Sequence, residues 1–118
     1  MKKVMIIIRP EKYRYTKEIL EQEGFDAYSV VNVLGRGKKQ VEFSLGDEIH
    51  STGDKNDHRL ITKKLITIYI NDEEEEKLCS TVIRSNQTEQ AGDGKIFVVP
   101  VKRSIRVRTG EENENVLI

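Results

Sequence analysis

The sequence has no tryptophan, a single cysteine and no excess of charge, and each of these shortages excludes a class of protein. One cysteine cannot form a disulfide within the chain, which favours a reducing compartment such as the cytoplasm. Twenty Lys and Arg residues balance 20 Asp and Glu residues, so the basic excess of a nucleic-acid or anionic-membrane binder is missing. The longest apolar run, Val4 to Ile8, is too short to cross a bilayer. We therefore expect a cytoplasmic protein with neither nucleic-acid binding nor membrane insertion.

The sequence is also poor in the groups that serve most metal centres and catalytic sites. His50 and His58 lie in a polar stretch without cysteine or paired carboxylates at ligand spacing, so no protein-held metal is expected. Two such histidines form no Ser-His-Asp or Cys-His arrangement. Cys79 falls on an apolar helical stripe, where a buried thiol is more common than a nucleophile. We assign no catalytic residue and do not expect an enzyme.

The hydrophobic pattern predicts a single domain over residues 1–118, in which the order strand, helix, strand occurs twice. Residues 35 to about 60 are polar with short apolar islands and are expected to form one long loop, which in a compact domain is usually functional. Two β-α-β units predict an α+β fold, a ferredoxin-like double βαβ sandwich with both helices on one face of the sheet. We expect strands over 4–8, 25–34, 65–70 and 96–101, helices over 11–23 and from 73 onward, and an extended segment over 105–109.

Apolar residues on both faces of two strands predict that the chain assembles with another subunit. In Val4 to Ile8 and in Ile96 to Val99, the residues that point to either face of the sheet are apolar. Two helices can cover only one face, which leaves a large apolar patch on the other. A neighbouring subunit is the expected cover for that patch.

Near the carboxyl end, a glycine-rich segment and an arginine pair have the composition of an anion site. Two glycines in Gly92-Asp93-Gly94-Lys95 let the backbone approach a ligand closely, because no Cβ is in the way. In the following Arg106-Val107-Arg108-Thr109-Gly110-Glu111, an extended chain would point Arg106 and Arg108 to the same face. Backbone NH groups, Lys95 and two arginines would clamp a polyphosphate. The alternative is a glycine-rich turn beside two surface arginines.

These two segments, in this order, resemble the B-loop and C-terminal signature of the PII (GlnB-like) signal-transduction proteins. Met1 to Pro10 resembles the first strand of that family, and Gly35-Arg36-Gly37-Lys38-Lys39 resembles the start of its long T-loop. The resemblance implies a homotrimer with the sheets facing inward and nucleotide sites in the clefts between neighbours. It divides the single domain into a T-loop over about 35–60, a B-loop over about 88–95 and a C-terminal segment over 103–118.

The resemblance also implies ligands and the residues that hold them. Lys39 stands where most of the family carries a Gln that helps to bind Mg²⁺ and 2-oxoglutarate, and a charged lysine cannot ligate a cation. This substitution argues against the usual Mg²⁺ site without excluding it. 2-Oxoglutarate would be bound by Lys39, Gln40 and Lys63. ATP or ADP would be bound by Ile7, Ser29, Gly35, Gly37, Lys38, Gly92, Asp93, Gly94, Lys95, Arg106 and Arg108.

The start of the long loop, together with Val41-Glu42-Phe43, resembles the NifI branch of the family, which is encoded in nitrogen-fixation clusters. The resemblance implies a nitrogen-regulatory protein that binds ATP or ADP and 2-oxoglutarate and controls a target through its T-loop. Nitrogenase or a paralogous PII protein is the candidate target. Alternatives are a general PII regulator of an ammonium transporter or of glutamine synthetase, and a static nucleotide-binding scaffold. A slow nucleotide hydrolase would depend on Asp93 as its only nearby base, and an RNA-binding module would need more strand aromatics than Phe97.

Overall fold

The computed structural model describes residues 1–36, 42–45, 48–51 and 60–112 of the chain. Four strands form an antiparallel sheet in the order β2-β5-β1-β6, and β3 pairs with β4 in a separate hairpin. The strands are β1 (Lys2–Ile8), β2 (Ser29–Gly35), β3 (Glu42–Leu45), β4 (Glu48–Ser51), β5 (Ile61–Ile70) and β6 (Gly94–Pro100). The helices are α1 (Tyr13–Gln22) and α2 (Glu75–Asn86), preceded by the 3-10 turns η1 (Pro10–Lys12) and η2 (Asp72–Glu74).

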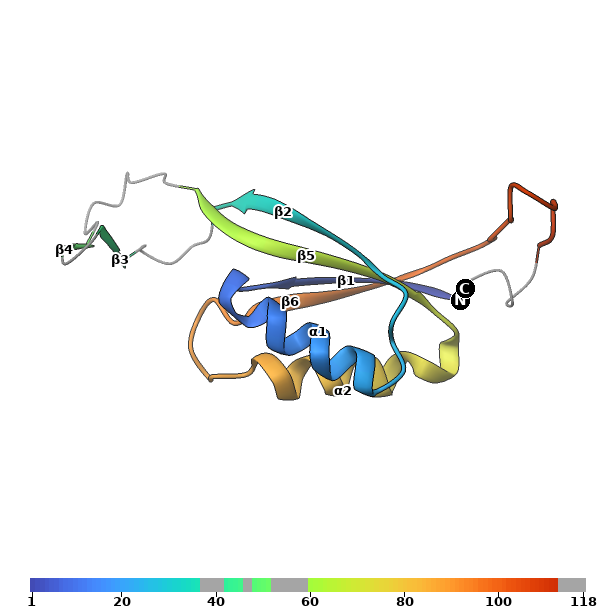
Figure 1. Cartoon of the computed structure of the whole chain (residues 1–118), viewed down its shortest axis with the longest axis horizontal. Coiled ribbons are helices and arrows are strands. Elements are labelled where there is room, and N and C mark those ends of the chain that lie inside the picture. Colours follow the sequence, from blue (N-terminus) through green and yellow to red (C-terminus); the bar gives the residue numbers. More distant parts are fainter. Residues whose placement is uncertain (37–41, 46–47, 52–59, 113–118) are drawn as a thin grey trace.

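Both helices pack on the same face of the four-stranded sheet, as Figure 1 shows. Leu20 of α1 and Leu78 of α2 are fully buried and close the core from the helix side. Burial of an aliphatic side chain of this size stabilises a fold by roughly 1.5–3 kcal/mol. The predicted α+β, ferredoxin-like architecture is confirmed. Every second residue of β1 and β5 supplies the core from the sheet side: Val4, Ile6, Ile8, Ile66, Ile68 and Ile70.

Each helix begins where the sequence supplies a suitable first turn. Pro10 opens η1, where its missing NH and fixed φ are compatible with the start of a helix. Before α2, the backbone NH of Asn71 donates to Oε1 of Glu74 at 3.2 Å, and acidic residues fill the first turn, where they suit the helix dipole. Among the described residues, no helix is both long and apolar enough to cross a membrane.

The element boundaries differ from the predictions in three places. The second strand begins at Ser29 instead of residue 25, because Phe25 turns into the core before the strand starts. Strand β5 begins at Ile61 instead of Leu65, because its polar first half pairs with β2 through the backbone and so needs no apolar pattern. The segment over 35 to about 60, expected to be one loop, contains the β3–β4 hairpin. Backbone pairing forms this hairpin as well, so it too needs no apolar pattern.

The buried face of α2 differs from the apolar stripe that the sequence shows. Leu78 of that stripe is buried, but Ile83 is half exposed, and Thr81, Ser85 and Asn86 are buried instead. Nδ2 of Asn86 donates to Oγ1 of Thr16 in α1 at 3.0 Å, so a polar contact joins the two helices. The hydroxyls of Thr81 and Ser85 and Nδ2 of Asn86 form hydrogen bonds, which offset the cost of their burial, whereas Oδ1 of Asn86 is buried without a partner in the described part of the chain. The rotation leaves Ile83 facing the rim of the molecule near β6.

The second face of the sheet carries no helix and has an apolar centre with lysines toward its two ends. Residues directly paired across antiparallel strands share a face, and Ile7 pairs with Leu65 on one side and with Lys95 on the other. One row further along, Met5 pairs with Phe97, whose side chain is 47% exposed. The structure confirms that the helices cover only one face, so the expectation of a covering subunit keeps its physical basis.

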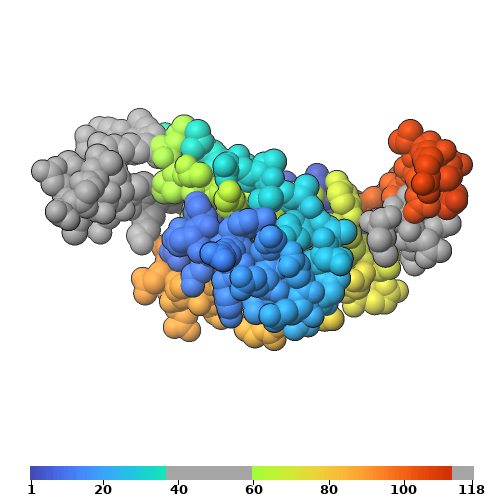
Figure 2. All heavy atoms as spheres, in the orientation of Figure 1, coloured from blue at the N-terminus to red at the C-terminus, as the bar shows by residue number. Residues whose placement is uncertain are grey.

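The C-terminal segment corrects the prediction of an extended strand over 105–109. Residues 107–109 form a turn, and Ile105 pairs with Glu112 only through an isolated bridge. The NH of Arg106 donates to the carbonyl of Glu111 at 2.9 Å, which closes the turn on itself. Gly110 supplies the positive φ of 73° that the turn needs, a local signal that outweighs the alternation of arginine and valine. Figure 2 shows this segment, in red, projecting from the body of the molecule.

Candidate functional site

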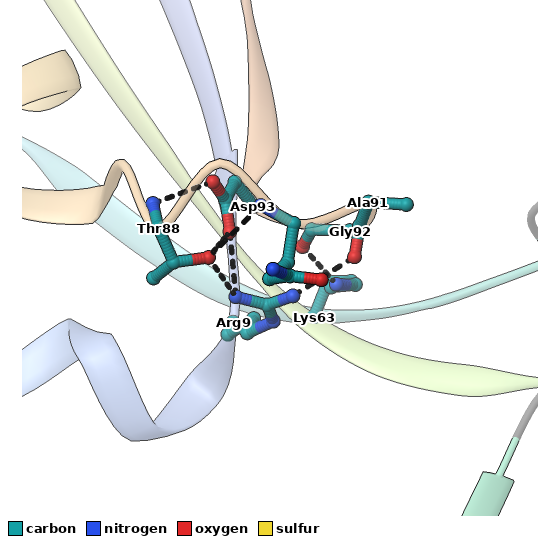
Figure 3. A network of polar contacts seen from close by, with 7 residues as sticks. Arg9, Lys63, Thr88, Ala91, Gly92 and Asp93 are labelled. Carbon is teal, nitrogen blue, oxygen red and sulfur yellow. Dashed lines mark hydrogen bonds and ion pairs between the residues drawn. The ribbon is translucent and has the colours of Figure 1, made fainter.

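The loop between α2 and β6 is held by the carboxylate of Asp93 (Figure 3). Its Oδ2 accepts a hydrogen bond from the backbone NH of Thr88 at 2.7 Å, and its Oδ1 accepts from the Thr88 hydroxyl. Nη1 of Arg9 donates to Oδ1 at 2.7 Å from the end of β1. These bonds from Thr88 and Arg9 lower the pKa of Asp93 to about 2, because they favour its charged form. Asp93 therefore serves as the anchor of the loop, and its charge is already neutralised within the chain.

Two cationic side chains meet the other side of the same loop. Nη2 of Arg9 donates to the carbonyl of Ala91 at 2.9 Å, and Nζ of Lys63 donates to the carbonyl of Gly92 at 2.9 Å. Burial, followed by the charge of Arg9, lowers the pKa of Lys63. The charges of Glu11 and Asp93 both raise the pKa of Lys63, so two carboxylates lie near the two cations of the corner formed by Arg9, Lys63 and Gly92. A carboxylate or phosphate ligand could bond there to Nζ of Lys63, whose acceptor in this structure is a neutral carbonyl.

Gly92 and Gly94 are required by the close approach of this loop to β1 and to the cations. Gly92 has a φ of 95°, and a Cβ there would lie 3.3 Å from Nη2 of Arg9. Gly94 has a φ of 132°, and a Cβ there would lie 2.1 Å from the carbonyl oxygen of Ile7. Side chains at either position would strain the backbone and push the loop away from Arg9 at Gly92 or from β1 at Gly94. These glycines permit close approach to the protein's own backbone and cations, and their approach to a ligand stays a prediction.

One end of the sheet brings together most of the residues expected to bind a nucleotide. Lys95 lies directly opposite Ile7 in the register of β1 and β6, on the face without helices. Gly35 ends β2 opposite Ile61, at the same end of the sheet. The glycine-rich loop leads into β6 at this same end of the sheet. Ile7, Gly35 and residues 92–95 therefore lie in one region. Lys63, expected to bind 2-oxoglutarate, contacts that loop directly.

The arginine pair lies at the other end of the molecule, so one chain by itself does not bring Lys95 and the two arginines together. Strand β6 runs from Gly94 to Pro100 between the two groups and spans about 20 Å at roughly 3.4 Å per residue. Figure 1 shows the C-terminal segment leaving the sheet at the end opposite the α2–β6 loop. Arg106 is paired with Glu111 at 3.3 Å, and Ser29 lies in β2 opposite Thr67, on the face without helices. One chain therefore carries two separated groups of candidate residues.

Several sequence predictions fall outside the described residues, and two site residues were missed. Gly37, Lys38, Lys39 and Gln40 lie outside the described part of the chain. Arg9 and Thr88 were missed, although they hold the loop. The available signal was Arg9 itself, a charge that ends an apolar strand next to Pro10, which favours extended backbone before it. Among the described residues, no three His, Cys, Asp or Glu side chains gather in a group that could hold a metal ion.

Comparisons with known proteins give one consistent result. The family model described as "Nitrogen regulatory protein P-II" matches residues 1–111. The chain is 40% identical to the "Nitrogen fixation nifHD region glnB-like protein 2" of Methanococcus maripaludis, over 97% of this chain and 98% of that protein. It is 36% identical to the "Nitrogen fixation nifHD1 region GlnB-like protein 2" of Methanosarcina barkeri, over 97% of both chains. The crystal structure of Arabidopsis thaliana PII bound to citrate is similar with a TM-score of 0.72 and 29% identity, over 98% of this chain and 88% of that one.

Proposed function

This chain belongs to the nitrogen regulatory protein P-II family, in its nitrogen-fixation branch, and we propose that it binds ATP or ADP together with 2-oxoglutarate to control a target protein. The observation that carries the proposal is the anchored loop over 88–95, which keeps its glycines beside Arg9 and Lys63. A rigid backbone beside cationic side chains is an arrangement that recognises phosphates and carboxylates. A regulator of this kind needs no catalytic group and is not an enzyme.

The nucleotide site is proposed to form between neighbouring chains of a cyclic homotrimer. Lys95 and the glycine-rich loop lie at one end of the sheet, and Arg106 and Arg108 lie at the other. A head-to-tail contact repeated around a closed ring joins the two ends in every interface. The apolar sheet face with Phe97 would turn inward and be covered. Gly35 and Ile7 would complete the site from the first chain, and Ser29, Gly37 and Lys38 are assigned to it from the family pattern.

The 2-oxoglutarate site is proposed at the corner formed by Arg9, Lys63 and Gly92. Nζ of Lys63 donates to a carbonyl in this structure, and a ligand carboxylate is a stronger acceptor for an ammonium group than a neutral carbonyl. Arg9 would remain bonded to Asp93 and would supply a second positive charge near the ligand. Lys39 and Gln40 are assigned to the same ligand from the family pattern. Mg²⁺ is not required by this arrangement.

The output is proposed to be a change in the T-loop, over about 35–60, that alters its fit to a target. Lys63 follows that loop closely and contacts the 88–95 loop, so a ligand that recruits Lys63 acts on both segments. A ligand that prefers one arrangement shifts the population toward it. The relatives from nifHD regions make nitrogenase or a paralogous PII protein the proposed target, in the cytoplasm. A general PII regulator of ammonium transport or glutamine synthetase is the alternative.

Calorimetry with ATP, ADP and 2-oxoglutarate, each alone and in pairs, tests this function. We expect nucleotide to bind alone and 2-oxoglutarate to bind more tightly once ATP is present, because both ligands lie against the same loop. Light scattering in the same buffer should give the mass of three chains. Absence of nucleotide binding would contradict the proposal, whereas binding without any response to 2-oxoglutarate would leave a static nucleotide-binding scaffold.

A further inference from the structure

An apolar pocket opens between α2 and β6, at the end of the molecule that carries the anchored loop. It has a volume of about 330 Å³, within the lower range for ligand and side-chain pockets. Its apolar lining comes from Ile8, Val82, Ile83 and Ile96, and its polar rim from Asn86, Gln87, Asp93 and Lys95. Ile83 is 50% exposed there, although the rest of that helix stripe is largely buried. We call this cavity the α2–β6 pocket, and its lining is suited to a branched aliphatic side chain.

The opposite end of the chain presents aliphatic residues to solvent, the half-exposed Ile105 and the fully exposed Val107. Val107 is 99% exposed, more than any other large hydrophobic residue of the described part. The NH of Gly110 donates to the carbonyl of Arg106 at 2.7 Å across the turn that carries Val107. At its base, Arg103 binds Glu112 through Nε at 2.5 Å and Nη2 at 3.0 Å. Two parallel bonds fix both position and orientation, so the turn holds Val107 in one place.

We propose that Val107 of one chain inserts into the α2–β6 pocket of the next chain in the ring. The pocket of the same chain is out of reach, because β6 separates the two features by about 20 Å. A second copy of the chain would bury the fully exposed valine and fill the open apolar pocket in the same contact. The contact is heterologous, and three such contacts close a ring.

This contact would also position the arginines for the site proposed above, on which the inference rests. Val107 lies between Arg106 and Arg108, and Lys95 and Gly94 lie at the edge of the α2–β6 pocket. Insertion of the valine therefore brings both guanidinium groups next to the anchored loop of the neighbour. Val107 acts as a positioning residue that sets the register between chains and touches no ligand itself.

Disulfide trapping tests the contact directly. We would combine Val107→Cys with Ile83→Cys in a Cys79→Ala background, oxidise with diamide, and separate the chains on a non-reducing gel. We expect covalent dimers and trimers that dithiothreitol reverses. The matched control replaces Ile83→Cys by Tyr15→Cys, because Tyr15 of α1 is also 50% exposed but does not line the pocket. This control should remain at the mass of one chain.

A second variant keeps the inference separable from the proposed function. Val107→Asp alters a fully exposed side chain and should fold normally, yet it should weaken ATP binding by roughly ten-fold because a charge cannot enter an apolar pocket. Val107→Leu should bind ATP as the natural chain does. If the natural chain forms trimers by light scattering but no disulfide is trapped, the inference alone is overturned. The same holds if the chain is trimeric and Val107→Asp binds ATP with unchanged affinity. A monomeric natural chain would overturn the ring and the inference together.

Discussion

Gly94 crosses β1 so closely that a side chain would meet the carbonyl oxygen of Ile7 at 2.1 Å. Its φ of 132° also lies in a region that side chains rarely adopt. We predict that Gly94→Ala lowers the free energy of unfolding by about 3 kcal/mol or more, because steric overlap adds to backbone strain. Urea unfolding at a fixed protein concentration measures this loss, since the stability of an oligomer depends on concentration.

Gly24→Ala is the matched control for that experiment. Gly24 has a φ of 91°, but no atom lies within 4 Å of the position its Cβ would take. The free energy of unfolding of this variant should fall by only about 1–2 kcal/mol, the strain of a non-glycine residue in the left-handed region. Equal losses at Gly24 and Gly94 would show that the contact with Ile7 has no role of its own.

Removal of the Arg9 guanidinium should release the loop over 88–93. Arg9 bonds to Asp93 and to the carbonyl of Ala91, so Arg9→Gln removes two charge-assisted contacts. We predict hydrogen exchange on the order of ten-fold faster at the loop amides, with the helices unaffected, because one such bond stabilises by about 1.5–3 kcal/mol. The control is Arg14→Gln, which removes the same charge from an exposed side chain whose pairing with Glu18 is weak. Equal protection of the loop in both variants would contradict the anchoring role.

The split site predicts that two defective chains complement each other. Lys95→Ala and Arg108→Ala should each weaken ATP binding by about 1.5–3 kcal/mol, the range for a hydrogen bond to a charged group. When the two variants are co-expressed with different tags and purified as mixed trimers, about a quarter of the sites at equal mixing should contain both natural residues. Calorimetry should then recover a tight-binding fraction that neither variant shows alone.

The control for complementation is a mixture in which both chains carry Arg108→Ala under the same two tags. It should show no tight-binding fraction, because no interface then receives an arginine at position 108. A mixed trimer of Lys95→Ala and Arg108→Ala without recovered sites would contradict the assignment of these residues to neighbouring chains.

Lys63 predicts the pH dependence of 2-oxoglutarate binding. Burial and the nearby Arg9 lower its pKa from the ordinary lysine value of 10.5. The folded chain therefore loses this proton before the unfolded chain does, so the charged lysine costs stability at lower pH and this cost is relieved as pH rises. The charged form is also the one that binds a carboxylate, so affinity should fall as the pH rises from neutral toward the ordinary lysine pKa. Calorimetry across this range, in the presence of ATP, measures the effect.

Lys63→Arg provides the control for the pH experiment. A guanidinium stays charged to about pH 12, so this variant should bind 2-oxoglutarate with little change over the same range. An affinity that falls equally in the natural chain and in Lys63→Arg would assign the pH dependence to another group.

The sequence by itself determined the fold class, the family and the glycine-rich loop. Alternating isoleucines in β1 and helical stripes with Leu20 and Leu78 are local patterns with strict periods, and the core follows them. Gly92 and Gly94 could be predicted because only glycine tolerates the backbone that they adopt. The double β-α-β order also predicted correctly that both helices lie on one face of the sheet, whereas the covering subunit expected from the apolar residues on both faces of β1 and β6 stays a prediction.

Only the tertiary structure decided which groups meet. Arg9 and Asp93 are 84 positions apart. Their contact depends on the order of strands in the sheet, which no local sequence pattern predicts. The same holds for Lys95 and Arg106, which are only 11 positions apart in the sequence but are held apart in space by β6 because a strand is stiff and extended. Val107 and the α2–β6 pocket likewise became visible only when the turn at 107–109 and the rotation of α2 were known. Periodicity fixes elements, whereas long-range contacts depend on how those elements are arranged in space.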